Sequence, residues 1–333
     1  MTTATPETEL DLDGSTGVVL APIRGRDVRR GLGSALFVKR PAHFTAKFGV
    51  AVALIGACWI FVALVAAWWT LLIAVPVLGL LYAHLVELQH ECLHEHAYNG
   101  RRINRLVGFL CGIPMLSSYW HYKYEHLRHH AFLGTPNNQE FFNYRFKGLD
   151  SVGGFLRACF HLGRYLDVFA NIGRSIVGRL HPCITKPVAA RRVRQEYRAF
   201  AVILVAAIAV SALTRNWYLV FVWVIPTLLV AEPTHFLIEL SEHFGLNTQT
   251  DPNVLSNTRT VHGSRFAKWF TNGNDLHTAH HFHQGVPMTH VPELHELIAG
   301  QVQTVEPSYW SFYRNVMTGR LRYQSDDQTC MTR

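Results

Sequence analysis

Long apolar segments dominate the first part of the chain. Residues 49–69 contain no charged side chain, and residues 71–88 are almost as apolar. Each segment is close to the length of about 20 residues that a helix needs to cross the hydrocarbon core of a membrane. Trp68 and Trp69 lie at the junction, where almost no loop remains. The pattern predicts a tight hairpin of two spanning helices, with Pro76 kinking the second helix without breaking it.

Further apolar segments follow at residues 200–213 and 217–231, with only residues 214–216 between them. They are shorter than the first pair, and we interpret them as a second hairpin. Residues 106–116 are too short to span and are expected to be re-entrant or interfacial. Residues 141–180 mix aromatic and basic side chains at helical spacing, which predicts an amphipathic helix on the bilayer surface. The predicted fold is an all-α integral membrane protein with four transmembrane helices in two hairpins and a cytoplasmic helical cap.

Composition agrees with a membrane protein and changes the interpretation of the charge. Only 16% of the residues are charged, whereas an average soluble domain contains about 25%. The formal net charge is +8, but the basic residues flank the apolar segments. We therefore expect contact with an anionic membrane surface and no nucleic-acid partner. Residues 1–38 are polar and aperiodic and are predicted to form a flexible cytoplasmic tail without a cleavable signal peptide, ahead of one domain at 39–333.

The basic flanks fall on one side of the four-helix arrangement. By the positive-inside rule that side is cytoplasmic, and both termini and the histidine clusters described next are expected there too. The basic residues are Lys39, Arg40, Arg101, Arg102, Arg105, Arg191, Arg192 and Arg194.

Eight of the twenty histidines form three short clusters beside the apolar segments. In a helix, spacings of three or four residues place side chains on one face. Neutral imidazole binds zinc, copper, iron or nickel. One ion needs three or four protein ligands, so eight histidines predict two ions in a site where histidine dominates and carboxylates are sparse. The eight are His90, His94, His126, His129, His130, His277, His280 and His281.

These clusters resemble the three histidine boxes of the membrane fatty acid desaturase family. The motifs are HxxxH at 90–94 and HxxHH at 126–130 and 277–281, and the resemblance covers roughly residues 40–315. It implies a non-haem centre of two Fe ions, cycling between Fe²⁺ and Fe³⁺, with O2 as co-substrate. The implied reaction is desaturation or hydroxylation of an unactivated C–H bond in a fatty acyl or other lipid-like substrate. An external electron donor such as ferredoxin or a cytochrome is implied as well.

A ninth histidine, His243, follows the fourth apolar segment, four residues after Glu239. Both returning helices would thus project side chains into one site. The segment resembles the region where structurally known acyl desaturases carry an extra histidine ligand, with an asparagine in the position of Glu239. That carboxylate could bind iron or orient His243, or the pair could simply end a spanning helix. Glu91 and Asn274 are further candidates for orienting a ligand.

Two other functions fit part of the pattern. Residues 90–94 also match HExxH, the zinc-protease motif in which Glu91 would be the general base, but this reading leaves both HxxHH clusters unexplained. A haem-carrying or metal-transporting protein is the third alternative, although transporters place polar residues at mid-span. His84, inside a span, could line a substrate channel. His43, His161, His181, His262, His290 and His295 are interpreted as ordinary surface or core residues, and His96, His121 and His283 as neighbours of the boxes.

Overall fold

The computed structural model describes residues 32–323 except 145, 150, 161, 180 and 182. Within this part the chain is mostly helical and contains almost no strand, which confirms the predicted all-α class. Its two strands, β1 (Thr260–Val261) and β2 (Val305–Glu306), form one short parallel pair. Most of the predicted N-terminal tail lies outside the described residues. The 3-10 helix η1 (Ser34–Phe37) belongs to the part that is described.

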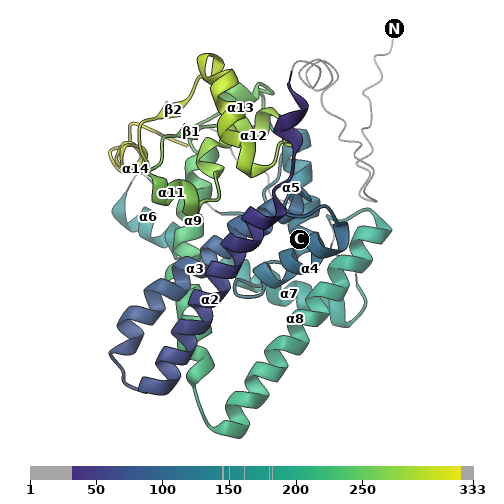
Figure 1. The fold of residues 1–333 in the computed structure, drawn as a ribbon, viewed down its shortest axis with the longest axis vertical. Coiled ribbons are helices and arrows are strands. Elements are labelled where there is room, and N and C mark those ends of the chain that lie inside the picture. The colour runs from purple at the N-terminus through teal and green to yellow at the C-terminus, as the bar shows by residue number, and fades with distance from the viewer. Residues whose placement is uncertain are drawn as a thin grey trace.

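Among the described residues, four helices are long and apolar enough to cross a membrane, as predicted. They are α2 (Pro41–Val65), α3 (Thr70–Leu93), α8 (Pro187–Thr214) and a fourth helix, Val220–His243. In Figure 1 the connections after α2 and after α8 lie at the bottom, and the C-terminal elements gather at the top. Each helix is longer than its apolar segment, so the polar ends project beyond the apolar layer.

The fourth helix changes its winding along its length. It contains two π-helical turns, η2 (Val220–Val224) and η3 (Thr227–Ala231), and ends as α9 (Glu232–His243). Pro226 lies between the two π turns; it has no N–H group, and its ring crowds the carbonyl four residues earlier. That carbonyl, on Val222, accepts a hydrogen bond of 2.6 Å from the Tyr82 hydroxyl of α3. In lipid no water could satisfy it, so α3 supplies the missing partner.

The fourth apolar segment ends at residue 231, and the helix continues for twelve more residues, as expected from the placement of Glu239 and His243 on the returning helix. The reason is a buried ion pair at Glu232, whose carboxylate receives Arg164 Nη2 at 2.7 Å and Arg164 Nε at 2.8 Å. Because this charge is paired, the helix tolerates it in its interior. The extension carries His243 to the same level as the end of α3.

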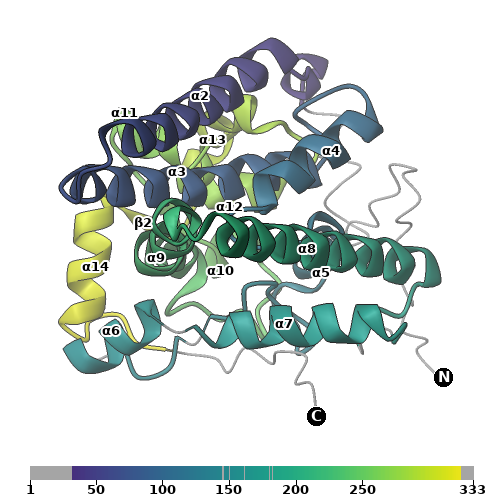
Figure 2. The same ribbon diagram turned by 90° about the horizontal axis from the view of Figure 1, so that it is seen from below.

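Close packing of α3 against the fourth helix forms the centre of the molecule. A Cβ atom at Gly79 would lie 2.3 Å from Val230 Cβ, so only glycine allows this approach. α8 instead packs on α7 (Gly163–Ile176) and α5 (Tyr119–Phe132). Figures 1 and 2 show α8 leaning away from the fourth helix, with α7 running beside it. The second helix of each hairpin, α3 in the first and Val220–His243 in the second, therefore packs against the other.

The segments between the spans cover the polar end. The apolar run at 106–116 lies largely in α4 (Arg101–Gly112), which packs on α3. The single amphipathic helix expected at 141–180 is instead two helices, α6 (Val152–Cys159) and α7, with a break after Cys159. Both expose apolar side chains, such as Leu166 at 74%, in keeping with a position at the bilayer surface.

The C-terminal part consists of short elements around a second apolar cluster. α12 (His277–Phe282) packs against α13 (Val291–Ile298) and β1, which hold it over the ends of the spanning helices. The remaining elements are α10 (Val254–Asn257), α11 (Arg265–Phe270), η4 (Asn274–Leu276), η5 (Met288–His290), η6 (Ala299–Gln301) and α14 (Tyr309–Met317).

Candidate metal centre

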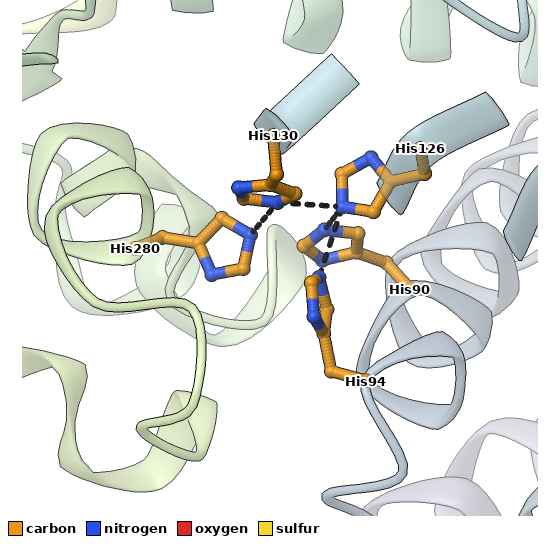
Figure 3. Close-up of side chains that lie close together, drawn as sticks. All are labelled: His90, His94, His126, His130 and His280. Atoms are coloured by element: carbon orange, nitrogen blue, oxygen red, sulfur yellow. Dashed lines mark hydrogen bonds between the residues drawn. The ribbon is translucent and has the colours of Figure 1, made fainter. Parts of the chain in front are cut away.

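Nine histidines from α3, α5, α9 and α12 converge in two groups. Within each group the ligand atoms lie within 4.8 Å of one another. Figure 3 shows the five imidazoles of the first group pointing toward a common point. The structure thus brings together every histidine that the sequence singled out as a candidate ligand. The first group is His90, His94, His126, His130 and His280, and the second is His129, His243, His277 and His281.

The first group has a contact pattern that hydrogen bonding alone cannot satisfy. The Nε2 atom of His126 lies 2.8 Å from Nε2 of His90, 2.9 Å from that of His94 and 3.0 Å from that of His130. A neutral imidazole nitrogen carries either a proton or a lone pair, so one proton bridges only one such contact. The other contacts would leave lone pairs facing each other in a buried site, which is unfavourable. A cation that accepts several lone pairs at once resolves the conflict.

The second group repeats this arrangement with four imidazoles. Nε2 of His277 lies 3.0 Å from Nε2 of His243, and Nε2 of His129 lies 3.3 Å from Nε2 of His281. The rings of His130 and His281, one from each group, stack with centroids 4.1 Å apart. The two groups are therefore neighbours, and two ions held by them would share one site.

Hydrogen bonds to the opposite ring nitrogen fix the tautomer in the second group. An Nδ1–H that donates to an oxygen leaves the Nε2 lone pair free for a metal and holds the ring in position. Of the acceptors, the sequence had suggested only Asn274; the others come from segments that the fold brings close. The pairs are His129 with Asn138 Oδ1 at 2.8 Å, His243 with the Asn257 carbonyl at 3.0 Å, and His277 with Asn274 Oδ1 at 2.9 Å.

The helix ends place two of these histidines more exactly than the spacing predicted. α3 ends at Leu93, so His94 is its C-terminal cap and not part of a continuing helix. Glu95 then adopts a left-handed conformation with φ 59°, which turns the chain away. At the end of α9, the buried Arg259 guanidinium donates to the carbonyl of Ser241 at 3.0 Å and to that of Phe244. These bonds satisfy carbonyls that the helix end leaves open and hold His243 in place.

Burial keeps the imidazoles neutral. It lowers the pKa of His126, His130 and His280 well below the usual value near 6.5, and neighbouring imidazoles lower it further. The pKa values of His94, His277 and His281 are lowered in the same way and for the same reasons. Metal binding requires the neutral form, so these side chains are already in the state that a metal ion needs.

A cavity between the two groups brings in carboxylates, of which the sequence had singled out only Glu239 as a candidate. Glu87, Glu140, Glu239 and Glu242 line it together with Tyr122, and the remaining wall is formed by histidines of both groups and Asn274. The expectation that carboxylates are sparse at this site was wrong. One signal was available, because Glu87 precedes His90 by three residues and so lies on the same helix face.

Glu239 lines this cavity, and its Oε1 lies 3.7 Å from His235 Nε2. Glu91 turns elsewhere: its Oε2 accepts a hydrogen bond of 2.8 Å from Asn272 Nδ2, and it does not line the cavity. His84 stacks on Trp269 with centroids 4.4 Å apart, a packing role within the core.

Two histidines outside these groups form a smaller cluster with Glu125 beside α5. The ligand atoms of His121, Glu125 and His181 lie within 4.8 Å of one another. His121 places Nε2 3.3 Å from Glu125 Oε1 and Nδ1 2.7 Å from the hydroxyl of Tyr197. Since hydrogen bonds already engage both nitrogens of His121, this group does not share the unsatisfied contacts of the two larger ones. His161 lies outside the described residues.

Fold and site together define a helical membrane protein with a buried, histidine-rich metal site. The fatty acid desaturase family model matches residues 66–313, about three quarters of the chain. The chain belongs to the fatty acid desaturase family, and membership implies an oxidoreductase that acts on a lipid substrate in a membrane. No curated protein matches the chain significantly.

Proposed function

We propose that this protein holds two iron ions at its nine histidines and uses O2 to oxidise an unactivated C–H bond of an acyl or similar lipid chain. The observation that carries the proposal is the convergence of nine imidazoles in two adjacent groups in a member of the desaturase family. Imidazole suits iron, and a pair of ions matches the two groups. When bound, the irons would supply the O2 and redox chemistry.

In this proposal the protein's own residues hold the two ions and orient the imidazole rings. Five histidines of the first group and four of the second would present Nε2 to the ions. Asn138, Asn257 and Asn274 would keep three of those rings in the correct tautomer. α12 would close the site from the side opposite to the spans and keep bulk water from the reacting groups. Electrons would come from an external donor such as ferredoxin or a cytochrome, docking on the basic cytoplasmic face that also carries the boxes and both termini.

The zinc-protease alternative has less support at this site. A protease of the HExxH type needs Glu91 beside the metal-bound water as general base. Here Glu91 is hydrogen-bonded to Asn272 and does not reach the cavity. A single zinc ion would also leave one of the two histidine groups without a role.

Comparative lipid analysis tests the proposal. We would express the wild type and His280→Ala, with His262→Ala as a matched control because His262 is exposed and belongs to neither group. Membranes from wild-type and control cells should gain unsaturated or hydroxylated acyl chains in air but not under anaerobic growth. His280→Ala should give none. An unchanged lipid profile in the wild type together with peptide cleavage that depends on zinc would refute it.

A further inference from the structure

Four carboxylates share the cavity between the two histidine groups. Glu87 comes from α3, Glu140 from the segment after α5, and Glu239 and Glu242 from α9. Two of them touch candidate ligands directly. Glu242 Oε2 lies 3.5 Å from His277 Nε2, and Glu140 Oε1 lies 2.6 Å from His129 Nδ1. The carboxylates are thus part of the same enclosed site as the converging imidazoles.

The protein does not balance these charges with its own cations. Among the described residues, no Lys or Arg nitrogen lies within 4.0 Å of any of the four carboxylates. Elsewhere it does: Glu232 is paired with Arg164 at 2.7 Å, and Glu95 with Lys123 at 2.8 Å. These two pairs show that the fold can supply a cation to an acid, but among the described residues it supplies none to the four carboxylates of the cavity.

Lys47 is the basic residue that comes nearest to an exception. Its Nζ donates to Asn272 Oδ1 at 2.7 Å, and Asn272 in turn donates to Glu91. Lys47 is therefore linked through Asn272 to Glu91, which does not line the cavity. His235 Nε2 lies 3.7 Å from both Glu87 Oε1 and Glu239 Oε1, beyond hydrogen-bond distance from either.

We propose that the four glutamates are the counter-charge of the metal pair. Nine neutral imidazoles bring no charge to two divalent ions, so the ions alone would leave four buried positive charges. Four carboxylates cancel them, and the loaded centre becomes neutral. The carboxylates offset the charge of the ions, and the ions offset the charge of the carboxylates. Buried charges of one sign are costly unless charges of the opposite sign lie close to them. This inference rests on the proposed function. It means that the carboxylates, in addition to the imidazole nitrogens, favour the binding of two divalent cations.

The proposal predicts opposite effects in the metal-free and metal-loaded protein. Without metal, the carboxylates repel one another, so removing one charge should stabilise the protein. With metal, the same change removes an attraction, so it should weaken binding and reduce the stabilisation that metal provides. A residue with a merely structural role would lower stability in both forms. The reversal of sign is thus specific to a counter-charge.

The test uses the full chain in nanodiscs, stripped of metal by a chelator and titrated with Co²⁺. Glu87→Gln, Glu239→Gln and Glu242→Gln preserve size and remove one charge each. We expect each to bind Co²⁺ at least tenfold more weakly than the wild type. The melting temperature of the metal-free variant should be higher than that of the wild type, and that of the loaded variant should be lower.

Glu196→Gln is the matched control. Glu196 accepts hydrogen bonds from Ser118 Oγ at 2.7 Å and Trp120 N at 2.9 Å, away from the cavity. It should lose stability in both forms and keep its Co²⁺ affinity. If the wild type does not bind two ions, the proposed function fails. If the wild type binds two and the three cavity variants bind them equally tightly, only the counter-charge inference is overturned.

Discussion

Acid should destabilise the metal-free protein steeply, because its candidate ligands are buried as neutral imidazoles. Six of them lie outside the spanning helices, and each has a pKa well below 6.5 because of burial and neighbouring histidines. In the unfolded chain the same residues have a pKa of about 6.5. As pH falls below that value, the unfolded state takes up protons that the folded state does not, so the free energy of unfolding decreases.

The size of the effect follows from the number of groups. Consider one histidine that is neutral in the folded protein but becomes protonated in the unfolded chain as the pH falls. Between pH 7 and 5.5 it lowers the free energy of unfolding by about 1.2 kcal/mol. Six such residues acting independently set an upper limit of about 7 kcal/mol on this loss, and Asp275, whose pKa burial raises to about 6, offsets part of it. This loss is comparable to the whole free energy of unfolding of many proteins, about 5 to 15 kcal/mol. The metal-free protein should thus be near its unfolding transition at pH 5.5.

Thermal unfolding followed by circular dichroism at a series of pH values measures this loss. His126→Gln combined with His280→Gln removes two of the six groups, so the variant should lose about 2 kcal/mol less over the same range. The metal-loaded wild type should remain folded to a lower pH than the metal-free protein, because protons must then compete with the ions for Nε2. A metal-free protein equally stable at pH 7 and 5.5 would contradict the reasoning.

Three further predictions concern the packing that positions the site. Gly79→Val should cost at least 1 to 3 kcal/mol by forcing α3 from the fourth helix, whereas Gly56→Val, which meets nothing within 4 Å, should be nearly neutral in thermal unfolding. Tyr82→Phe should cost about 1 to 3 kcal/mol because the Val222 carbonyl loses its partner; an unchanged melting temperature would mean that another donor replaces it. Arg164→Met should cost about 3 to 5 kcal/mol by leaving Glu232 unpaired, and adding Glu232→Leu should restore most of it; a double variant no better than the single one would argue against the pairing.

Local spacing explains why so much of the site was visible in the sequence. His126 and His130 lie on one helix face wherever α5 points, and His277 and His281 behave in the same way on α12. Apolar length likewise reveals a spanning helix without knowledge of its neighbours. Such features depend only on residues a few positions apart, so they can be recognised before the fold is known.

Features that depend on distant contacts were missed. Asn257 reaches His243 only because the segment after α9 folds back, and Glu140 reaches His129 through a turn after α5. The helix through Glu239 and His243 was expected, but the residue that pairs with Glu232 within it, Arg164, comes 68 residues earlier in the chain. Nothing in the local pattern signals these contacts, because each is decided by how the helices pack.

The most direct test of the central claim is the metal content of each histidine group taken separately. The purified wild type should contain two irons per chain by mass spectrometry. His94→Ala, in the first group, should lose mainly one ion and His243→Ala, in the second, mainly the other, with His262→Ala unchanged. Mössbauer spectra of the wild type should show two iron environments, one of which disappears in each variant. Zinc alone in the wild type, or two irons retained in both variants, would contradict the account.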